Sequence, residues 1–273
     1  LLKIAPNVRP EALGGGFQID GASGSENVFV VDGQEVTNFR TGTLNSNNNL
    51  PFELLQEVQI KSTGFEAEYG GATGGVINAV TQGGNNDWHG NFGISFKPSK
   101  FQGDPNISLN TYDVTSATGF DYFQPNKDGG TDFFPVASIS GPIIKDRFWG
   151  LVTYAPQIFE TTRRIDYYSS RSPSRTITNT LEYSQTERTE QAFARLDAQP
   201  VSSLRMFGSF LWNPIVRDGS LPGSTSGLAG SDALSVSDYA ARGGRQNSNA
   251  VNGQVTWTPS NSVVLNFRSG RSF

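Results

Sequence analysis

From residue 88 to the end of the chain, apolar and polar residues alternate with period two, which is the pattern of a strand with two different faces. Three or more apolar residues share one side in each of the segments 89–97, 192–198, 204–212 and 251–258. In the first of these the apolar side holds Phe92, Ile94 and Phe96. The alternation has exceptions at Phe193, Phe207 and Leu211, which fall on the polar side.

The connections between these strands alternate as well. Tight polar turns containing a proline are predicted at 141–148, 197–204 and 256–264, where proline suits a turn or a strand end. Long polar segments separate them, at 98–133, around 160–190 and at 217–246. Short turns at one end and long loops at the other are typical of an outer-membrane β-barrel, and a soluble sandwich gives no reason for such sorting.

Four tryptophans also fit this interpretation. Trp88, Trp149, Trp212 and Trp257 lie near the predicted strand ends, where an amphipathic ring can sit at a membrane interface. The alternative is that these rings belong to the core of a soluble β-sandwich. The sorted loops favour the barrel.

Composition excludes several classes of protein. The chain has no cysteine, so disulfides, thiolate metal sites and thiol nucleophiles are ruled out. Its 25 acidic and 21 basic residues give a net charge of −4 without a basic block, so we expect no nucleic-acid partner. The longest apolar run is the four residues 28–31, whereas a spanning helix needs about 20.

Residues 1–87 differ in character from the rest. Short β-rich pieces at 16–20, 27–33, 56–62 and 75–81 lie between glycines, and a single helical turn is predicted at 51–58. We therefore predict two domains, 1–87 and 88–273. The stretch AEYGGATGGVINAVTQGG at 67–84 holds six glycines around a short apolar run, so something must order a segment whose composition resembles a linker.

Three segments carry a resemblance to a known family: NVFVVDGQEVTN at 27–38, PFELLQEVQIKSTGFEAEYGGATGGVINAVTQGG at 51–84 and WHGNFGISF at 88–96. In this order and spacing they resemble the second half of the plug of a TonB-dependent receptor, followed by its first barrel strand. The segment IDGASGSENVFVVDGQEVTNFRTG at 19–42 is similar to the Oar-like branch of that family.

The resemblance implies a partial antiparallel all-β membrane barrel with a small mixed α+β plug inside it. It also implies that the plug motif is structural, with glycines packed closely against the barrel wall. A phosphate cradle is excluded because no Lys-Ser or Lys-Thr follows the glycines. The motif residues are Asp32, Gly33, Glu68, Tyr69, Gly70, Gly71, Gly74, Gly75 and Asn78.

The resemblance further implies location in the outer membrane of a Gram-negative bacterium, in contact with its lipid. An inner-membrane TonB complex would pull on the plug, and an extracellular ligand of unknown kind, a peptide, protein or glycan, would pass through. The alternative is a surface adhesin or structural outer-membrane protein without transport. About seven strands are expected, whereas plugged transporters have about 22, so we expect a fragment of a longer chain.

Candidate sites are few. We expect no enzyme activity, cofactor or metal, because His89 is the single histidine and no catalytic motif surrounds it. Candidate ligand contacts are Phe39, Arg40 and Asn45 in a possible apical plug loop, and Tyr167 and Tyr168, beside Arg163, in a surface hairpin. The competing interpretations are a polar turn and an extended hairpin arm. A calcium loop at 126–132 is weaker still, since it lacks spaced carboxylates.

Overall fold

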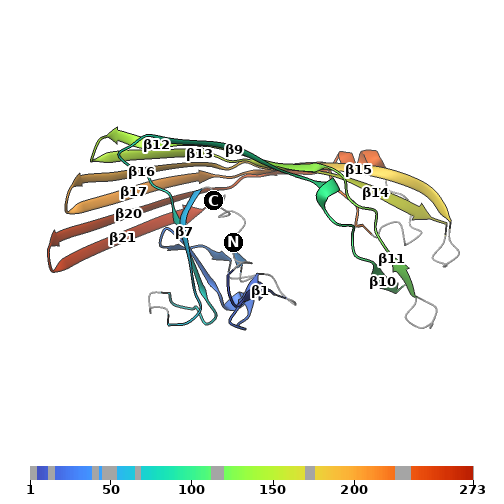
Figure 1. Ribbon diagram of the computed structural model, residues 1–273, viewed down its shortest axis with the longest axis horizontal. Helices are drawn as coiled ribbons and strands as arrows, with labels where there is room; N and C mark the ends of the chain where they lie inside the picture. Colours follow the sequence, from blue (N-terminus) through green and yellow to red (C-terminus); the bar gives the residue numbers. More distant parts are fainter. Residues whose placement is uncertain are drawn as a thin grey trace.

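The computed structural model describes residues 5–11, 16–38, 43–44, 54–64, 69–111, 120–169, 176–224 and 235–272. A large, curved antiparallel sheet runs the length of the molecule, and a small domain built from the N-terminal residues lies against one of its faces (Figure 1). No helix in these ranges is both long enough and apolar enough to cross a membrane.

The large sheet has eleven strands, in the order β19-β18-β15-β14-β12-β13-β16-β17-β20-β21, with β9 paired to β12. Their bounds are β9 His89–Pro98, β12 Thr131–Ile144, β13 Phe148–Tyr154, β14 Gln157–Tyr168, β15 Ile177–Thr189, β16 Ala192–Val201, β17 Leu204–Trp212, β18 Ile215–Asp218, β19 Gly243–Gln246, β20 Asn249–Ser260 and β21 Val263–Ser272.

Four of the long strands are interrupted for two residues, at 155–156, 190–191, 213–214 and 247–248. The interruptions lie side by side across the sheet, because backbone hydrogen bonds join Ala155 to Gln191, Glu190 to Pro214 and Asn213 to Ser248 at 2.8–3.0 Å. Seven lengths of chain therefore make up the eleven strands, the number that the alternation predicts.

Short turns and long connections lie at opposite ends of this sheet (Figure 1). The turns β12–β13, β16–β17 and β20–β21 span only residues 145–147, 202–203 and 261–262. The long connections carry the remaining elements of this region, which are η5 Ser99–Phe101, β10 Ser108–Thr111, β11 Phe120–Phe123 and α1 Val236–Ala240. The loop asymmetry predicted from the sequence is confirmed.

The alternation separates the two faces of the sheet as expected. Phe92, Ile94 and Phe96 are 82%, 62% and 62% exposed on the face away from the small domain. A row in register continues this face through Ile139, Val152, Ala194, Phe210 and Val251. The face is apolar without being buried, as a wall in contact with lipid requires.

The exceptions to the alternation mark where the small domain rests on the sheet. Phe193 and Leu211 turn to the opposite face and are buried in one cluster with Leu54 of the small domain, together with Leu151 and Ala250. The third exception, Phe207, lies on the same inner face, beneath the guanidinium of Arg195. Apolar residues at these inward positions thus pack against protein and not against water.

The small domain is built on a four-stranded sheet with the order β4-β3-β8-β7, in which β3 and β8 are parallel. Ile19, Phe29 and Ile77 form its core on one face, and Val28, Val30 and Val76 form it on the other. The elements of the domain are β1 Val8–Pro10, β2 Phe17–Ile19, η2 Gly24–Glu26, β3 Val28–Val31, β4 Gln34–Glu35, β5 Thr37–Asn38, β6 Thr43–Leu44, β7 Leu55–Lys61 and β8 Val76–Thr81.

At the start of 51–58 the helical turn expected to feed the next strand ends at Leu54, whose backbone is 3-10 helical, and strand β7 follows directly from Leu55; residues 51–53 lie outside the described ranges. One local prediction is wrong. Trp149 does not face lipid, because its indole Nε1 donates to Asn86 Oδ1 at 2.7 Å on the inner face. A strand-end position alone does not tell which face a ring occupies.

Candidate functional site

The contact between the small domain and the large sheet begins at the turn between β3 and β4. Asp32 and Gly33 have positive φ angles of 49° and 78°, as expected for two-residue hairpins of the Asp-Gly type. A side chain at Gly33 would also be only 3.0 Å from the guanidinium of Arg268 on β21. The positive φ therefore favours glycine here, and a side chain would in addition displace the guanidinium of Arg268.

Asp32 is held mainly by its own domain. Its carboxylate accepts hydrogen bonds from the backbone N–H of Thr81 at 2.9 Å and from the Thr81 hydroxyl at 2.7 Å. Thr81 is the last residue of β8, so these bonds fix the turn to the end of the central strand. Only 2% of the Asp32 side chain is exposed.

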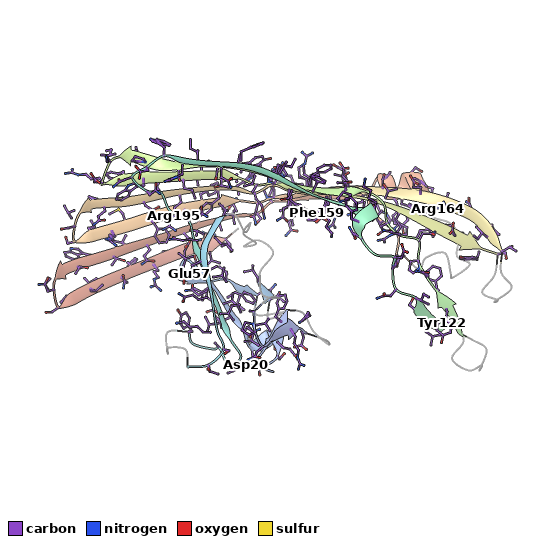
Figure 2. All side chains as sticks on the ribbon, viewed as in Figure 1. Asp20, Glu57, Tyr122, Phe159, Arg164 and Arg195 are labelled. Carbon is purple, nitrogen blue, oxygen red and sulfur yellow. The ribbon has the colours of Figure 1, made fainter. Side chains whose placement is uncertain are left out.

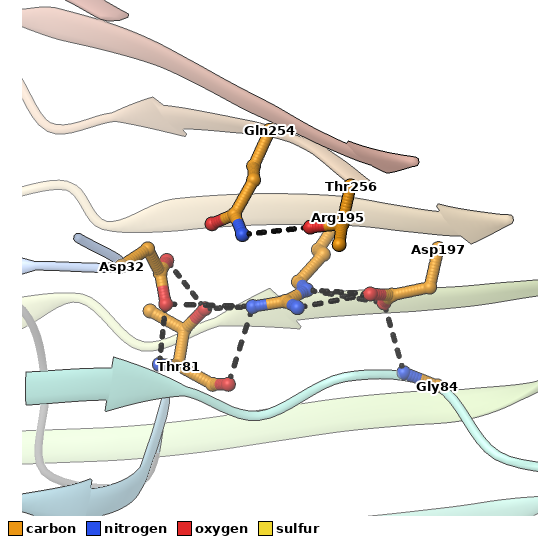
Figure 3. A network of polar contacts seen from close by, with 7 residues as sticks. All are labelled: Asp32, Thr81, Gly84, Arg195, Asp197, Gln254 and Thr256. Carbon is orange, nitrogen blue, oxygen red and sulfur yellow. Dashed lines mark hydrogen bonds and ion pairs between the residues drawn. The ribbon is translucent and has the colours of Figure 1, made fainter. Parts of the chain in front are cut away.

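Arg195 lies on β16 of the large sheet (Figure 2) and reaches from the wall to this pair (Figure 3). Its Nη1 donates to Thr81 Oγ1 at 2.7 Å and to the Thr81 carbonyl at 3.3 Å, and it lies 3.5 Å from Asp32 Oδ1. Its Nε and Nη2 donate to Asp197 at 2.9–3.1 Å. The guanidinium also stacks 4.1 Å above the ring of Phe207. We call Asp32, Thr81, Arg195 and Asp197 the latch.

A cavity of about 300 Å³ lies beside the latch, between the small domain and the wall. It is lined by Val28, Val30, Asp32, Gly33, Glu35, Tyr69, Asn78, Val80, Arg195, Phe207, Gln254 and Arg268. Four motif residues, Asp32, Gly33, Tyr69 and Asn78, thus line this space. The buried Oδ1 of Asn78 has no protein partner within the described ranges, so the cavity offers a polar wall to water.

The segment that leads from β8 into β9 is tied to the wall as well. Asn86 accepts from the backbone N–H of Asp146 at 2.9 Å and from Trp149, and its amide donates to the Asp146 carboxylate at 2.6 Å. Gly84 fits so closely that a Cβ would lie 2.5 Å from that of Trp149. Its N–H points to Asp197 Oδ2 at 3.4 Å, so linker and latch share one carboxylate.

The sequence prediction names Asp32 and Gly33 among these contacts and misses Arg195, Asp197, Thr81 and Asn86. For Arg195 and Asp197 the sequence did contain a signal. Both are charged residues on the inner side of a strand that also carries the apolar exception Phe193, and this combination is expected where the inner face of the wall contacts another part of the protein. Nothing local distinguishes Thr81 or Asn86, because their partners lie 49 and 60 positions away.

Apart from Gly33, the motif glycines do not pack against the wall. A Cβ at Gly75 would lie 2.7 Å from Ile19, and one at Gly74 would lie 2.8 Å from Asn27, so the close packing is within the small domain and not against the wall. Gly71 has a φ of 88°, whereas Gly70 borders open space. Glu68 lies outside the described residues.

The proposed ligand contacts divide in two. Phe39, Arg40 and Asn45 lie outside the described residues. Tyr167 is only 6% exposed and its hydroxyl shares a 2.9 Å hydrogen bond with that of Tyr183, while Tyr168 is half-buried. The Tyr183 ring meets Tyr239 of α1 edge to face at 5.1 Å, and burial raises the pKa of Tyr183 above its ordinary value. Tyr167 therefore serves the packing of the arm formed by β14 and β15.

The loop at 126–132 is held to the same arm. Asp128 receives two hydrogen bonds from Arg163, which also donates to the Pro222 carbonyl at 2.6 Å, and Asn126 donates to Asp166 at 2.7 Å. The loop oxygens thus serve contacts within the protein. Within the described part of the chain, acidic and histidine side chains form no cluster of three suited to a metal ion.

Comparison with known proteins agrees with this architecture. Residues 1–76 match the model of the TonB-dependent receptor plug domain family. The chain is 32% identical over 168 residues to the TonB-dependent transporter Oar of Myxococcus xanthus, an alignment that covers 61% of this chain and 15% of that protein. The aligned segment therefore spans about a seventh of that relative's length.

Solved structures share the fold. The siderophore receptor PirA of Acinetobacter baumannii superposes with a TM-score of 0.62 at 15% identity, over 98% of this chain and 36% of that one. The outer membrane transporter YddB of Escherichia coli gives 0.62 at 15% identity, over 100% and 36%. Residues 1–76 thus match a plug domain, the large sheet has the fold of part of a receptor barrel wall, and the resemblance stated from the sequence is confirmed.

Proposed function

We propose, from the premise that this chain is part of a TonB-dependent receptor of the Oar-like branch, that it forms the gated portion of an energised outer-membrane transporter. In this proposal residues 1–87 are the plug, whose last residues, 82–87, form its linker to the barrel, and residues 88–273 begin the barrel. A ligand binds from outside, and the inner-membrane TonB complex pulls on the plug so that the ligand passes. Import and export are both consistent with this mechanism.

The observation that carries the proposal is the nature of the contact between plug and wall. A permanent contact between two β domains is expected to be mainly apolar, since buried apolar area gives the largest stabilisation. Here one apolar cluster around Leu54 is accompanied by a hydrogen-bonded polar network and a polar cavity. Such a contact holds the plug in place and still separates without exposing a large apolar surface.

The motif residues have supporting roles in this proposal. Asp32 and Gly33 form the turn that docks on the wall, and Gly71, Gly74 and Gly75 let the segment before β8 pack inside the plug. Tyr69 and Asn78 line the cavity. Ligand contacts by Phe39, Arg40, Asn45 and Tyr168 stay predictions. Tyr167 is buried, so in this proposal it contributes to the packing of the arm and does not contact a ligand.

The test uses the native host and does not need the ligand to be known in advance. Components of the growth medium are quantified after growth of wild-type cells, cells lacking the receptor and cells lacking the TonB energy coupling. We expect at least one component to change in the same direction in both deletion strains. Transport is contradicted if no component differs, while loss of cell attachment in the receptor deletion alone would support the adhesin.

A further inference from the structure

The latch consists of two halves that each satisfy their own charge. On the plug, the Asp32 carboxylate is held by two donors of Thr81 at 2.7 and 2.9 Å. On the wall, Arg195 makes a forked pair with Asp197 at 2.9–3.1 Å. The contacts that join the halves all come from a single atom, Arg195 Nη1.

This division decides what is lost when the plug leaves. Removing one partner of a buried ion pair normally leaves an uncompensated charge, which makes separation costly. Here Asp32 keeps both hydrogen bonds from Thr81, and Arg195 keeps its counter-ion. The direct approach of Asp32 to Arg195, at 3.5 Å, is the longest contact in the network and is the weakest by geometry.

The wall half is also held from a second side. Asp197 lies against Gly83 and receives the N–H of Gly84, and both glycines precede Asn86, which is bonded to Asp146 and Trp149. The linker therefore stabilises the position of Asp197, and Asp197 in turn fixes the guanidinium of Arg195. Residues 82–83 lie between the end of the plug sheet and this anchored segment.

We propose that the latch opens between Thr81 and Arg195, and that the wall half, Arg195 with Asp197 and the linker at 84–86, stays assembled while the plug is away. Asp197 is then a positioning residue. It holds the Arg195 guanidinium in its docked orientation while the plug is away, so the side chain does not have to find its rotamer again when the plug returns. The proposal rests on the proposed function for its biological meaning, but its physical content is a property of the isolated receptor.

The test is a re-docking experiment on the purified full-length receptor in detergent micelles. Glu35, exposed on β4 beside the latch, is replaced by cysteine and labelled with an environment-sensitive fluorophore; the 273 residues contain no other cysteine. A pulse of dilute urea releases the plug, and dilution starts re-docking. Because no ligand and no energy source are involved, a failed uptake experiment and a failed re-docking experiment are distinguishable.

We expect Asp197→Asn to slow re-docking about tenfold, which corresponds to about 1.4 kcal/mol in the barrier, and Asp197→Glu to restore most of the rate. Asp32→Asn should ease release while re-docking stays within about threefold of the parent rate, because the wall half is intact. The matched control is Glu187→Gln, which removes the carboxylate partner of Arg217 far from the plug.

The proposal is overturned if Asp197→Asn shifts only the urea needed for release and re-docks at the parent rate, since Asp197 would then be an ordinary contact. It is equally overturned if Asp32→Asn slows re-docking as much as Asp197→Asn does. Should Asp197→Asn not assemble in micelles, Asn86→Ala decides the matter, because it frees the linker without changing a charge. A severalfold slower re-docking supports the proposal, and an unchanged rate rejects it.

Discussion

The large sheet makes two kinds of contact with the segments that fold onto it. At the plug, charged side chains meet across the interface, and each side keeps its own counterpart when the two separate. At the arm of β14 and β15, the rings of Tyr167, Tyr183 and Tyr239 are packed together with Ile165, Leu181 and Leu221. The first contact suits release, and the second suits a permanent attachment of the long connections.

This difference follows from what each contact removes from water. Separating Tyr239 from Tyr183 exposes aromatic surface to water and uncovers the buried hydroxyl pair of Tyr167 and Tyr183. The cost in free energy is large, because no new interaction replaces the lost contacts. Separating Asp32 from Arg195 leaves both groups hydrogen-bonded, so the loss is small. The fold thus places its rigid contact at the long-loop end of the sheet and its separable contact at the plug.

The largest expected effect is at the arm. Tyr183→Ala removes the centre of the aromatic cluster and should destabilise the attachment of α1 by about 3–5 kcal/mol, the usual range for deleting a large buried ring. Hydrogen exchange at 236–240 in the purified receptor measures this loss. Exchange in the plug strands should stay as it is, and a change there would mean that the two contacts are not independent.

The plug contact should respond less strongly. Arg195→Ala removes every bond between the latch halves and, among the residues that the structure describes, leaves Asp197 with the Gly84 N–H alone, so we expect about 2 kcal/mol less resistance to plug release. The urea midpoint of release measures it. Arg217→Ala, which breaks an exposed ion pair on the arm, is the control and should cost at most about 1 kcal/mol.

A smaller effect is expected at the docking turn. Gly33→Ala places a side chain at φ 78°, against the guanidinium of Arg268, and should weaken plug docking by about 1–2 kcal/mol. Gly70→Ala is the matched control, since a Cβ there meets open space. Equal midpoints for the two variants would show that the turn does not bear on the wall.

The smallest effect concerns pH. Because burial raises the pKa of Tyr183, folding favours its neutral form. Its contribution to stability is therefore complete below the ordinary tyrosine pKa of about 10 and is lost as pH rises above that value. Absorbance at 295 nm should show a late ionisation step in the folded receptor that Tyr183→Phe reduces. If the late ionisation step were the same in Tyr183→Phe, the step would belong to another tyrosine, and the Tyr183 hydroxyl would not be shielded from water as the structure shows.

Sequence patterns determined much of the large sheet. Period-two alternation fixes which side chains of 89–97 and 251–258 share a face, because successive residues of a strand point to opposite sides. Turn chemistry likewise predicts short turns within 141–148, 197–204 and 256–264, and the structure has them at 145–147, 202–203 and 261–262. The exceptions Phe193, Phe207 and Leu211 even locate the part of the wall that the plug covers, since inward apolar residues need a protein neighbour.

The latch was decided only by tertiary structure. Asp32 and Thr81 are 49 positions apart, and Arg195 is a further 114 positions along the chain, so no local pattern can bring them together. The same holds for Trp149, which the pattern places at a lipid interface and the fold turns inward to Asn86. Local sequence determines which residues share a face of a strand; the partner that each face meets depends on how distant segments pack, and hydrogen bonding and burial settle that choice only in the folded chain.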